Sequence, residues 1–392
     1  MSLVHNDGMR TFGVEEELLI VDPADGRPLP LAGELLASSR TAAGTLSVVG
    51  DPVLAVEFKR EQIEVQTCPC SSLDGLLGEI RRGRDAADAA ARAVGARVAA
   101  LATSPLPTVT HTTRGPRYAA MMDGFGLTAR EQLTCGLHVH VSVGSDEEGV
   151  AVLDRIRIWL PVLAALSANS PFWNGADTGY ASYRTQAWGR WPTAGPVELF
   201  GSAARYHSLI AGYIASGVLL DEGMVYFDAR LSRKYPTVEV RVSDVCLYAE
   251  DAVLIAGLVR ALVETAAREW RQGIPPCPVP AALLRLALWR ASRSGINGDL
   301  LHPVDNRPQP APDIIEALLN HVRAALADSG DLHRVRSGLA AIMRRGTGEG
   351  RQRATLARTG KLSAVVTDAI RSSRRSQPLG GSPAGAGILS AG

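Results

Sequence analysis

Three segments of the chain alternate apolar and ionisable residues with the period of a β-strand: residues 13–21, 134–143 and 237–244. Successive side chains of a strand point to opposite faces, so each segment would present an apolar row on one face and a polar row on the other. The polar rows contain Glu15 and Glu17 in the first strand, His138 and His140 in the second, and Glu239 and Arg241 in the third. A sheet built from these strands would gather carboxylates, imidazoles and a guanidinium on one face.

A fourth strand is predicted to end at Thr67, in a segment that carries carboxylates at Glu57, Glu61 and Glu64. Their separation places Glu57 and Glu64 on opposite faces of a flat strand, so a bend or bulge is needed to bring them together. The same spacing would put all three acids on one face of a helix. The β-rich residues 63–67 and the Cys-Pro pair that follows favour a strand entered through a turn.

Apolar residues near helical spacing predict helices over much of the remaining chain. An alanine-rich scaffold helix is expected over residues 72–103. A second helix is expected to begin at the capping residue Ser145 and to continue to Leu163. Further helices are expected at residues 118–122, 203–222, 251–271, 281–291, 311–328, 333–344 and 361–374. The tail, residues 376–392, is rich in Gly, Pro, Ser and Ala and is expected to be disordered.

Residues 169–184, followed by Trp188, form an unusually aromatic segment. A long loop of this kind is usually functional, because irregular backbone with buried rings needs a packing partner. Its tyrosine, tryptophan and arginine side chains suit a small polar ligand or a purine ring. A tightly packed surface loop is the alternative.

Composition narrows the class of protein. Of the 392 residues, 46% are hydrophobic, which permits one large domain or two moderate ones. The formal charge of +1 does not point to nucleic acid or to an anionic membrane as a partner. The five cysteines lack paired metal-finger spacing and indicate reduced thiols. The first ten residues carry no apolar signal core, and no window approaches the roughly 18 apolar residues of a spanning helix, so a cytoplasmic protein is expected.

The polar face requires a chemical explanation, because burying an unpaired carboxylate costs roughly several kcal/mol. Taken singly, the acidic strand could be a solvent-facing edge, the two histidines could be structural, and the acid and arginine of the third strand could form a solvated pair. Taken together, many oxygen donors and few cysteines favour Mg²⁺ or Mn²⁺ over zinc. Such a face suits nucleotide phosphoryl transfer, in which an arginine stabilises the developing charge. The chain has no Walker-type loop, so a P-loop mechanism is excluded.

Several motifs occur in an order that resembles a known family. They are Gly13-Val14-Glu15-Glu16-Glu17, Glu57 with Glu64, Cys135-Gly136-Leu137-His138-Val139-His140-Val141, the aromatic segment, Glu239-Val240-Arg241, and Gly346-Thr347-Gly348 before Gln352. Over about residues 10–360 the chain resembles the bacterial YbdK-type carboxylate–amine ligases, which belong to the second glutamate–cysteine ligase family and are related in fold to glutamine synthetase. The resemblance implies an α+β fold in which a curved, mostly antiparallel sheet binds ATP and Mg²⁺ on its concave face and carries helices on the other side. It also implies a single catalytic domain over residues 1–375.

The same resemblance implies a reaction. ATP would phosphorylate a carboxylate, typically the side chain of L-glutamate, and an amine would then displace the phosphate; the amine could be cysteine, another amino acid or a small amine. The implied metal ligands are Glu15, Glu57, Glu64, His138 and Glu239, the nucleotide-binding residues are Glu17, His140 and Arg241, and the substrate contacts are Tyr183, Arg184 and Trp188. Arg241 and Glu239 are the implied catalytic residues, with Arg241 facing the transferred phosphoryl group. Glu61 is an additional acid that could alter metal number or amine choice, and a homodimer is expected.

Two other functions remain open at this point. A phosphotransferase resembling the guanidino kinases would need only one acceptor, whereas a ligase needs both a carboxylate and an amine before ADP accumulates. A metal-binding relative without activity is the third possibility. The acids, histidines and arginine retained on three strands argue against it, because buried charge without metal and nucleotide would be costly.

Overall fold

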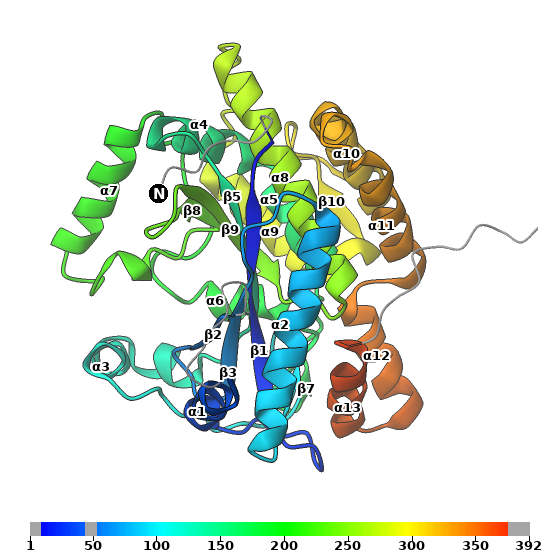
Figure 1. Cartoon of the computed structure of the whole chain (residues 1–392). Helices are drawn as coiled ribbons and strands as arrows, with labels where there is room; N and C mark the ends of the chain where they lie inside the picture. The colour runs from blue at the N-terminus through cyan, green and yellow to red at the C-terminus, as the bar shows by residue number, and fades with distance from the viewer. Residues whose placement is uncertain (1–8, 44–52, 375–392) are drawn as a thin grey trace, which may run out of the picture.

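A seven-stranded sheet forms the centre of the computed structural model, which describes residues 9–43 and 53–374 (Figure 1). The strands of this sheet are β1 (Phe12–Val21), β2 (Val53–Val56), β3 (Gln62–Gln66), β4 (Arg97–Ala99), β5 (Gly136–Ser142), β8 (Ala229–Leu231) and β9 (Thr237–Asp244). Their order is β2-β3-β1-β5-β9-β8, and β4 pairs with the end of β1. Each pairing in this sheet is antiparallel. The α+β class with a mostly antiparallel sheet is therefore confirmed.

Helices surround the sheet and account for most of the remaining described residues. They are α1 (Ala32–Ala43), α2 (Leu73–Ala93), α3 (Pro116–Glu131), α4 (Asp146–Ile156), α5 (Leu160–Ser167), α6 (Tyr183–Trp188), α7 (Ala203–Ala215), α8 (Ala249–Arg271), α9 (Ala281–Ser294), α10 (Ala311–Asp328), α11 (Leu332–Arg345), α12 (Gly348–Thr359) and α13 (Leu362–Ser372). Two short hairpins, β6 (Phe172–Trp173) with β7 (Ala176–Asp177) and β10 (Asp299–Leu301) with β11 (Pro308–Pro310), stand apart from the main sheet.

The apolar rows of the strands face the helices α2, α5 and α8, which pack against the sheet. Figure 1 shows α2 running alongside β1 and β3. Leu137, Val139 and Val141 of β5 and Val240 of β9 are fully buried in the resulting core. Burial of such side chains stabilises the fold by roughly 1.5–3 kcal/mol each, which fixes the face to which each strand turns its polar residues.

The middle acid of β1 belongs to this helical side. Glu16 is buried and receives two hydrogen bonds from Arg84 of α2, from Nε at 2.8 Å and Nη2 at 2.6 Å. Arg84 also donates to the carbonyl oxygens of Cys246, Leu247 and Ser373. The three consecutive acids of β1 are thus divided by the pleat: Glu16 anchors α2, while its two neighbours point to the opposite face.

Two predicted helices are too long. The helix expected over residues 72–103 ends at Ala93, the chain turns through Gly95 at a positive φ of 79°, and β4 follows. Glycine adopts that backbone conformation without strain, and alanine is equally common on both sides of the turn, so composition did not reveal the end. The helix expected from Ser145 to Leu163 is divided into α4 and α5 by a turn at residues 157–159.

Other expectations have mixed outcomes. As predicted, the strand that ends near Thr67 is entered through a turn: residues 57–61 connect β2 to β3. The helix expected at residues 118–122 extends over the whole of α3, and the one expected over 203–222 ends at Ala215. The predicted disordered tail, residues 376–392, lies outside the described residues, and the single domain over 1–375 stays a prediction. In the ranges that the structure describes, no helix combines the length and apolarity needed to cross a bilayer.

Candidate functional site

Strand register brings the ionisable side chains together on the face opposite the helical core. The directly opposed cross-strand pairs are Glu17 with Glu64, Glu15 with His138, and His140 with Glu239. Opposed side chains in antiparallel strands have Cβ atoms roughly 4.5–5.5 Å apart, so each pair makes contact. Four adjacent strands therefore contribute to one continuous polar surface.

Three carboxylates form what we call the acidic triad: Glu17 of β1, Glu57 of the turn after β2, and Glu64 of β3. One oxygen from each lies within 4.8 Å of the others. Burial raises the pKa of Glu57 well above its ordinary value, and the charges of Glu64 and Glu17 raise it further. Burial and the charge of Glu15 also raise the pKa of Glu64. The turn at residues 57–61 is the bend that the sequence required, and it creates a concentration of negative charge.

A second group, the mixed cluster, consists of Glu15, His140 and Glu239, which also offer ligand atoms within 4.8 Å of one another. Burial opposes the ionisation of Glu15, but interactions with His138 and His140 outweigh it and hold its pKa below the ordinary value. Its carboxylate lies 3.4 Å from Nδ1 of His138 and 3.5 Å from Nε2 of His140. Burial and the neighbouring Arg241 lower the pKa of His138, which favours the neutral imidazole that binds metals.

Arg241 lies beside the mixed cluster. Its guanidinium is buried, contacts Glu239, and has Nη1 3.4 Å from Nδ1 of His138. Burial opposes the charged form, but Glu239 outweighs it and raises the pKa of Arg241. The Nε atom of Arg241 has no hydrogen-bond partner among the described residues. The solvated-pair alternative for Glu239 and Arg241 is therefore wrong: the pair is buried and retains a donor for another ligand.

The donor set fits hard divalent cations. The carboxylates of the acidic triad are close together, and none of them forms an ion pair with a basic side chain in the described part of the chain. Carboxylate oxygens with an imidazole are ligands that Mg²⁺ and Mn²⁺ accept. A cation bound at the acidic triad would neutralise charge that the described residues leave without a counter-ion, whereas Glu239 of the mixed cluster is already paired with Arg230 and Arg241.

The aromatic segment supplies a cavity of about 310 Å³, which we call the Trp188 cavity. Arg184 and Trp188 are four residues apart on α6 and therefore share one helix face, which lines the cavity together with Arg241. The guanidinium carbons of Arg184 and Arg241 lie 5.8 and 5.9 Å from the Trp188 ring centroid. Tyr183 is not part of this lining. It packs instead against Trp173 and Tyr180, because it points to another side of α6.

Arg184 has a structural role in this cavity wall. It donates to the carbonyl oxygens of Arg241 at 3.2 Å and Val242 at 3.4 Å, which follow Val240, the last residue of β9 that pairs with β8. A Cβ at Gly136 would come within 2.4 Å of Nη2 of Arg184, so only glycine permits this approach. Arg184 thus holds the strand that carries Arg241.

The motif at residues 346–352 anchors the start of the aromatic segment. Nε2 of Gln352 donates to the backbone oxygen and to Oδ1 of Asn169, at 2.8 and 2.7 Å. A Cβ on Gly348 would lie 2.1 Å from that Oδ1. Asn169 in turn donates to the carbonyl oxygens of Ala100 and Val245. Two motifs that are far apart in sequence therefore form one buried contact.

Two residues of this face, Arg230 and Asp228, were not predicted, and a third, Glu61, does not have the role that its acidity suggested. Arg230 of β8 donates to both oxygens of Glu239, and Asp228 lines the Trp188 cavity. The strand β8 has only three residues, too few to show a period. Glu61 turns away from the metal-binding candidates and accepts hydrogen bonds from the backbone N–H of His111, so its link to metal number has no structural support.

Comparisons with known proteins agree with the geometry. The sequence profile of the glutamate-cysteine ligase family 2 matches residues 11–368. A protein of Paenarthrobacter aurescens named "Putative glutamate--cysteine ligase 2-1" is 59% identical over 382 residues, which are 97% of this chain and 98% of that protein. A relative from Streptomyces coelicolor, named as a glutamate–cysteine ligase 2 in the same way, is 53% identical over 93% of this chain and 99% of its own length.

Among solved structures, a glutamate–cysteine ligase from Francisella tularensis in complex with AMP has a TM-score of 0.65 at 16% identity and covers 95% of this chain and 90% of its own. A bifunctional glutathione synthetase from Pasteurella multocida has a TM-score of 0.66 at 15% identity and covers 93% of this chain and 52% of its own. At these identities the likeness concerns the fold, and it confirms the sheet-and-helix architecture that the sequence resemblance implied.

Proposed function

Because this chain is a member of glutamate–cysteine ligase family 2 and an ATP-dependent ligase, we propose that it phosphorylates the side-chain carboxylate of L-glutamate and joins it to an amine. The amine is cysteine, another amino acid or a small amine. ADP and phosphate are the other products. The substrates are small molecules, which agrees with a site formed by side chains on one face of a sheet.

The observation that supports this proposal best is the environment of Arg241. Its buried guanidinium contacts Glu239 and His138, faces the acidic groups, and retains an Nε donor without a partner among the described residues. A fixed positive charge of this kind stabilises phosphoryl oxygens as charge develops, without reorganisation of solvent. It is the group we assign to the transferred phosphoryl.

Mg²⁺ or Mn²⁺ is supported by the donor set. We assign one ion to the acidic triad and one to the mixed cluster, with His138 beside the second. Bound there, the ions would neutralise the phosphate charges of ATP. The role of the protein is to fix these ligands. Strand register holds all of them except Glu57, which the turn between β2 and β3 positions, and Glu17 additionally accepts a hydrogen bond from the backbone N–H of Gly136 at 2.6 Å.

The reaction has two balanced steps. The γ-phosphoryl group of ATP passes to a carboxylate oxygen of glutamate, which releases ADP and gives an acyl phosphate. The amine nitrogen then forms a bond to the carbonyl carbon, the bond from that carbon to the phosphate oxygen breaks, and the nitrogen loses its proton. Arg241 contributes to both steps by holding positive charge beside the phosphoryl oxygens.

ADP release with Mg-ATP and L-glutamate, screened against a panel of amino acids and amines, tests the proposal. We expect turnover that requires both glutamate and one amine, and a γ-glutamyl adduct by mass spectrometry. The Glu64→Gln variant is the control for contaminating ATPases. ADP formation that needs only a single acceptor and gives a stable phosphorylated product would contradict the ligase and identify a phosphotransferase.

A further inference from the structure

Asp228 is a buried acid without a partner. The residue is only 8% exposed and immediately precedes β8. Its backbone N–H donates to Gly195 at 3.2 Å and its carbonyl oxygen accepts from Arg241 at 2.8 Å. Its side-chain carboxylate, in contrast, accepts no hydrogen bond and forms no ion pair with any residue in the described ranges. The carboxylate oxygens are not fully enclosed, so a ligand in the cavity that Asp228 lines can reach them and supply a donor.

The surroundings of Asp228 point to the Trp188 cavity. Arg184 of α6 and Arg285 of α9 are the charges that act on its carboxylate, and both line this cavity with it. Arg184 is already engaged with backbone carbonyls. Arg285 is exposed and forms no ion pair within the described residues. The cavity therefore offers one acceptor and one donor that are both free, next to Arg241.

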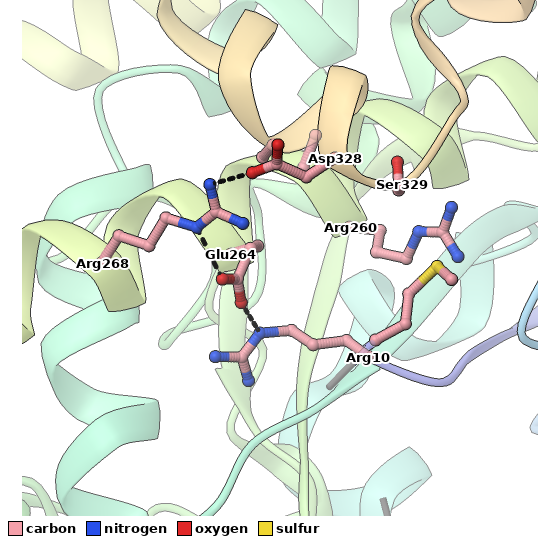
Figure 2. A pocket seen from close by; sticks show the side chains of 9 residues that line it. Arg10, Arg260, Glu264, Arg268, Asp328 and Ser329 are labelled. Atoms are coloured by element: carbon pink, nitrogen blue, oxygen red, sulfur yellow. Dashed lines mark hydrogen bonds and ion pairs between the residues drawn. The ribbon is translucent and has the colours of Figure 1, made fainter. Parts of the chain in front are cut away.

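A second cavity shows what a satisfied site looks like. Arg10, together with residues of α8 and α10, lines a cavity of about 220 Å³, whose side chains are drawn in Figure 2. Glu264 accepts from Nε of Arg10 at 2.8 Å and from Nε of Arg268 at 2.7 Å, and Arg268 also donates to Asp328 at 2.5 Å. The two carboxylates of this cavity, unlike that of Asp228, thus already have arginine partners.

We propose that the Trp188 cavity binds the head group of an α-amino acid substrate, with the ammonium at Asp228 and the α-carboxylate at Arg285. The inference rests on the proposed function and deepens it, since it names the residues that select an amino acid. The volume of about 310 Å³ lies at the small end of the roughly 300–1,000 Å³ typical of ligand pockets. Arg241 connects this cavity to the phosphoryl-transfer residues, because it belongs to both.

The ionisation of Asp228 is consistent with this role. Burial raises its pKa to about 7, and the charges of Arg184 and Arg285 act in the opposite direction. The other charged groups that line the cavity are Arg241 of β9 and Arg190, and Arg190 is paired with Glu131. A bound ammonium favours the ionised carboxylate, so binding at neutral pH releases protons and weakens as the pH falls below 7.

The test is the Asp228→Asn variant, which keeps the size of the side chain and removes its charge. L-glutamate and L-cysteine are titrated separately into wild type and variant by calorimetry without ATP, and KM values are measured in the ADP assay. We expect the dissociation constant of one amino acid to rise at least about tenfold, as for loss of a charge-assisted hydrogen bond, while KM for ATP is unchanged. Arg285→Gln should weaken the same amino acid.

A matched control makes the same chemical change in the other cavity: Asp328→Asn should alter neither titration. Weaker binding of glutamate assigns the cavity to the substrate that supplies the carboxylate, and weaker binding of cysteine assigns it to the substrate that supplies the amine. Either result supports the head-group subsite. Unchanged binding of both by folded Asp228→Asn overturns it, and if that variant does not fold, Arg285→Gln decides in the same way. Because the titrations need no turnover, binding that depends on Asp228 without any ligase activity would count against the proposed function alone.

Discussion

The acidic triad should destabilise the metal-free protein, and Glu64→Gln should relieve that effect. Unfolded carboxyl groups ionise near a pKa of about 4.3, whereas burial raises the pKa of Glu64 and of Glu57 in the folded chain. When the pH rises, the unfolded chain releases its protons first. The free energy of unfolding therefore falls as the pH passes from the unfolded pKa through the raised folded one.

The size of the effect follows from the geometry. Two carboxylate charges at 4.8 Å, the largest separation of the ligand atoms in the triad, repel by about 3.5 kcal/mol at an effective dielectric constant of about 20. Glutamine removes the charge at position 64 and can still accept the hydrogen bond that Gln66 donates at 2.5 Å. Since partial protonation already reduces the repulsion, we expect the metal-free variant to be about 1–3 kcal/mol more stable than wild type at pH 8. The difference should shrink at pH 5.

Urea denaturation in the presence of EDTA, at both pH values, measures this difference. With Mg²⁺ the order should reverse, because only wild type gains the full binding energy, and ATP turnover of the variant should fall by at least about a hundredfold. Glu61→Gln is the matched control. Glutamine is a weaker acceptor than the buried Glu61 carboxylate for the backbone N–H of His111, so this variant should have a lower free energy of unfolding than wild type at pH 8. A Glu64→Gln protein that is less stable than wild type in EDTA at pH 8, or that retains normal turnover, would refute the reasoning.

Three further substitutions test other contacts. Arg241→Lys keeps the charge but loses the planar fork, so kcat should fall at least about a hundredfold while titrated ATP affinity changes little; a normal kcat would remove Arg241 from phosphoryl transfer. Glu16→Gln leaves the buried Arg84 without its counter-ion and should lower the free energy of unfolding by about 3–5 kcal/mol in urea; wild-type stability would mean that the pair contributes little. Gly348→Ala puts a methyl group against Asn169, so scanning calorimetry should show a free energy of unfolding that is lower by about 1–3 kcal/mol. An unchanged melting temperature would show that Asn169 moves aside without cost.

The period of the strands was enough to select most members of the site. Glu15, Glu17, His138 and His140 stand on one face because alternation is a local property of the sequence. Their partners across the sheet were not predictable in the same way, since register depends on strands that are far apart in the chain. A bend was needed to bring Glu57 beside Glu64. The sequence indicated such a bend but not the residues at which it occurs.

Other features had no local signal. The strand β8, which carries Arg230, is too short for a period, and the end of α2 lies in a stretch that stays rich in alanine. Alternation predicted that Glu16 lies on the face opposite Glu15 and Glu17, but its ion pair with Arg84, 68 residues later, escaped prediction. Tyr183 and Trp188 were grouped by proximity in sequence, whereas the turn of α6 separates them.

The acceptors of Arg84 have a consequence for synthesis of the chain on the ribosome. Its guanidinium joins the first strand of the sheet to the backbone oxygen of Ser373, 289 residues later, and Ser373 Oγ in turn accepts from the N–H of Ala100. A nascent chain that has not yet reached α13 has an incompletely bonded cation beneath β1. The strand that is made first is thus among the last to gain all its contacts, and a truncated product that ends before Ser373 would leave Arg84 without one of its acceptors and Ala100 without its hydrogen-bond partner.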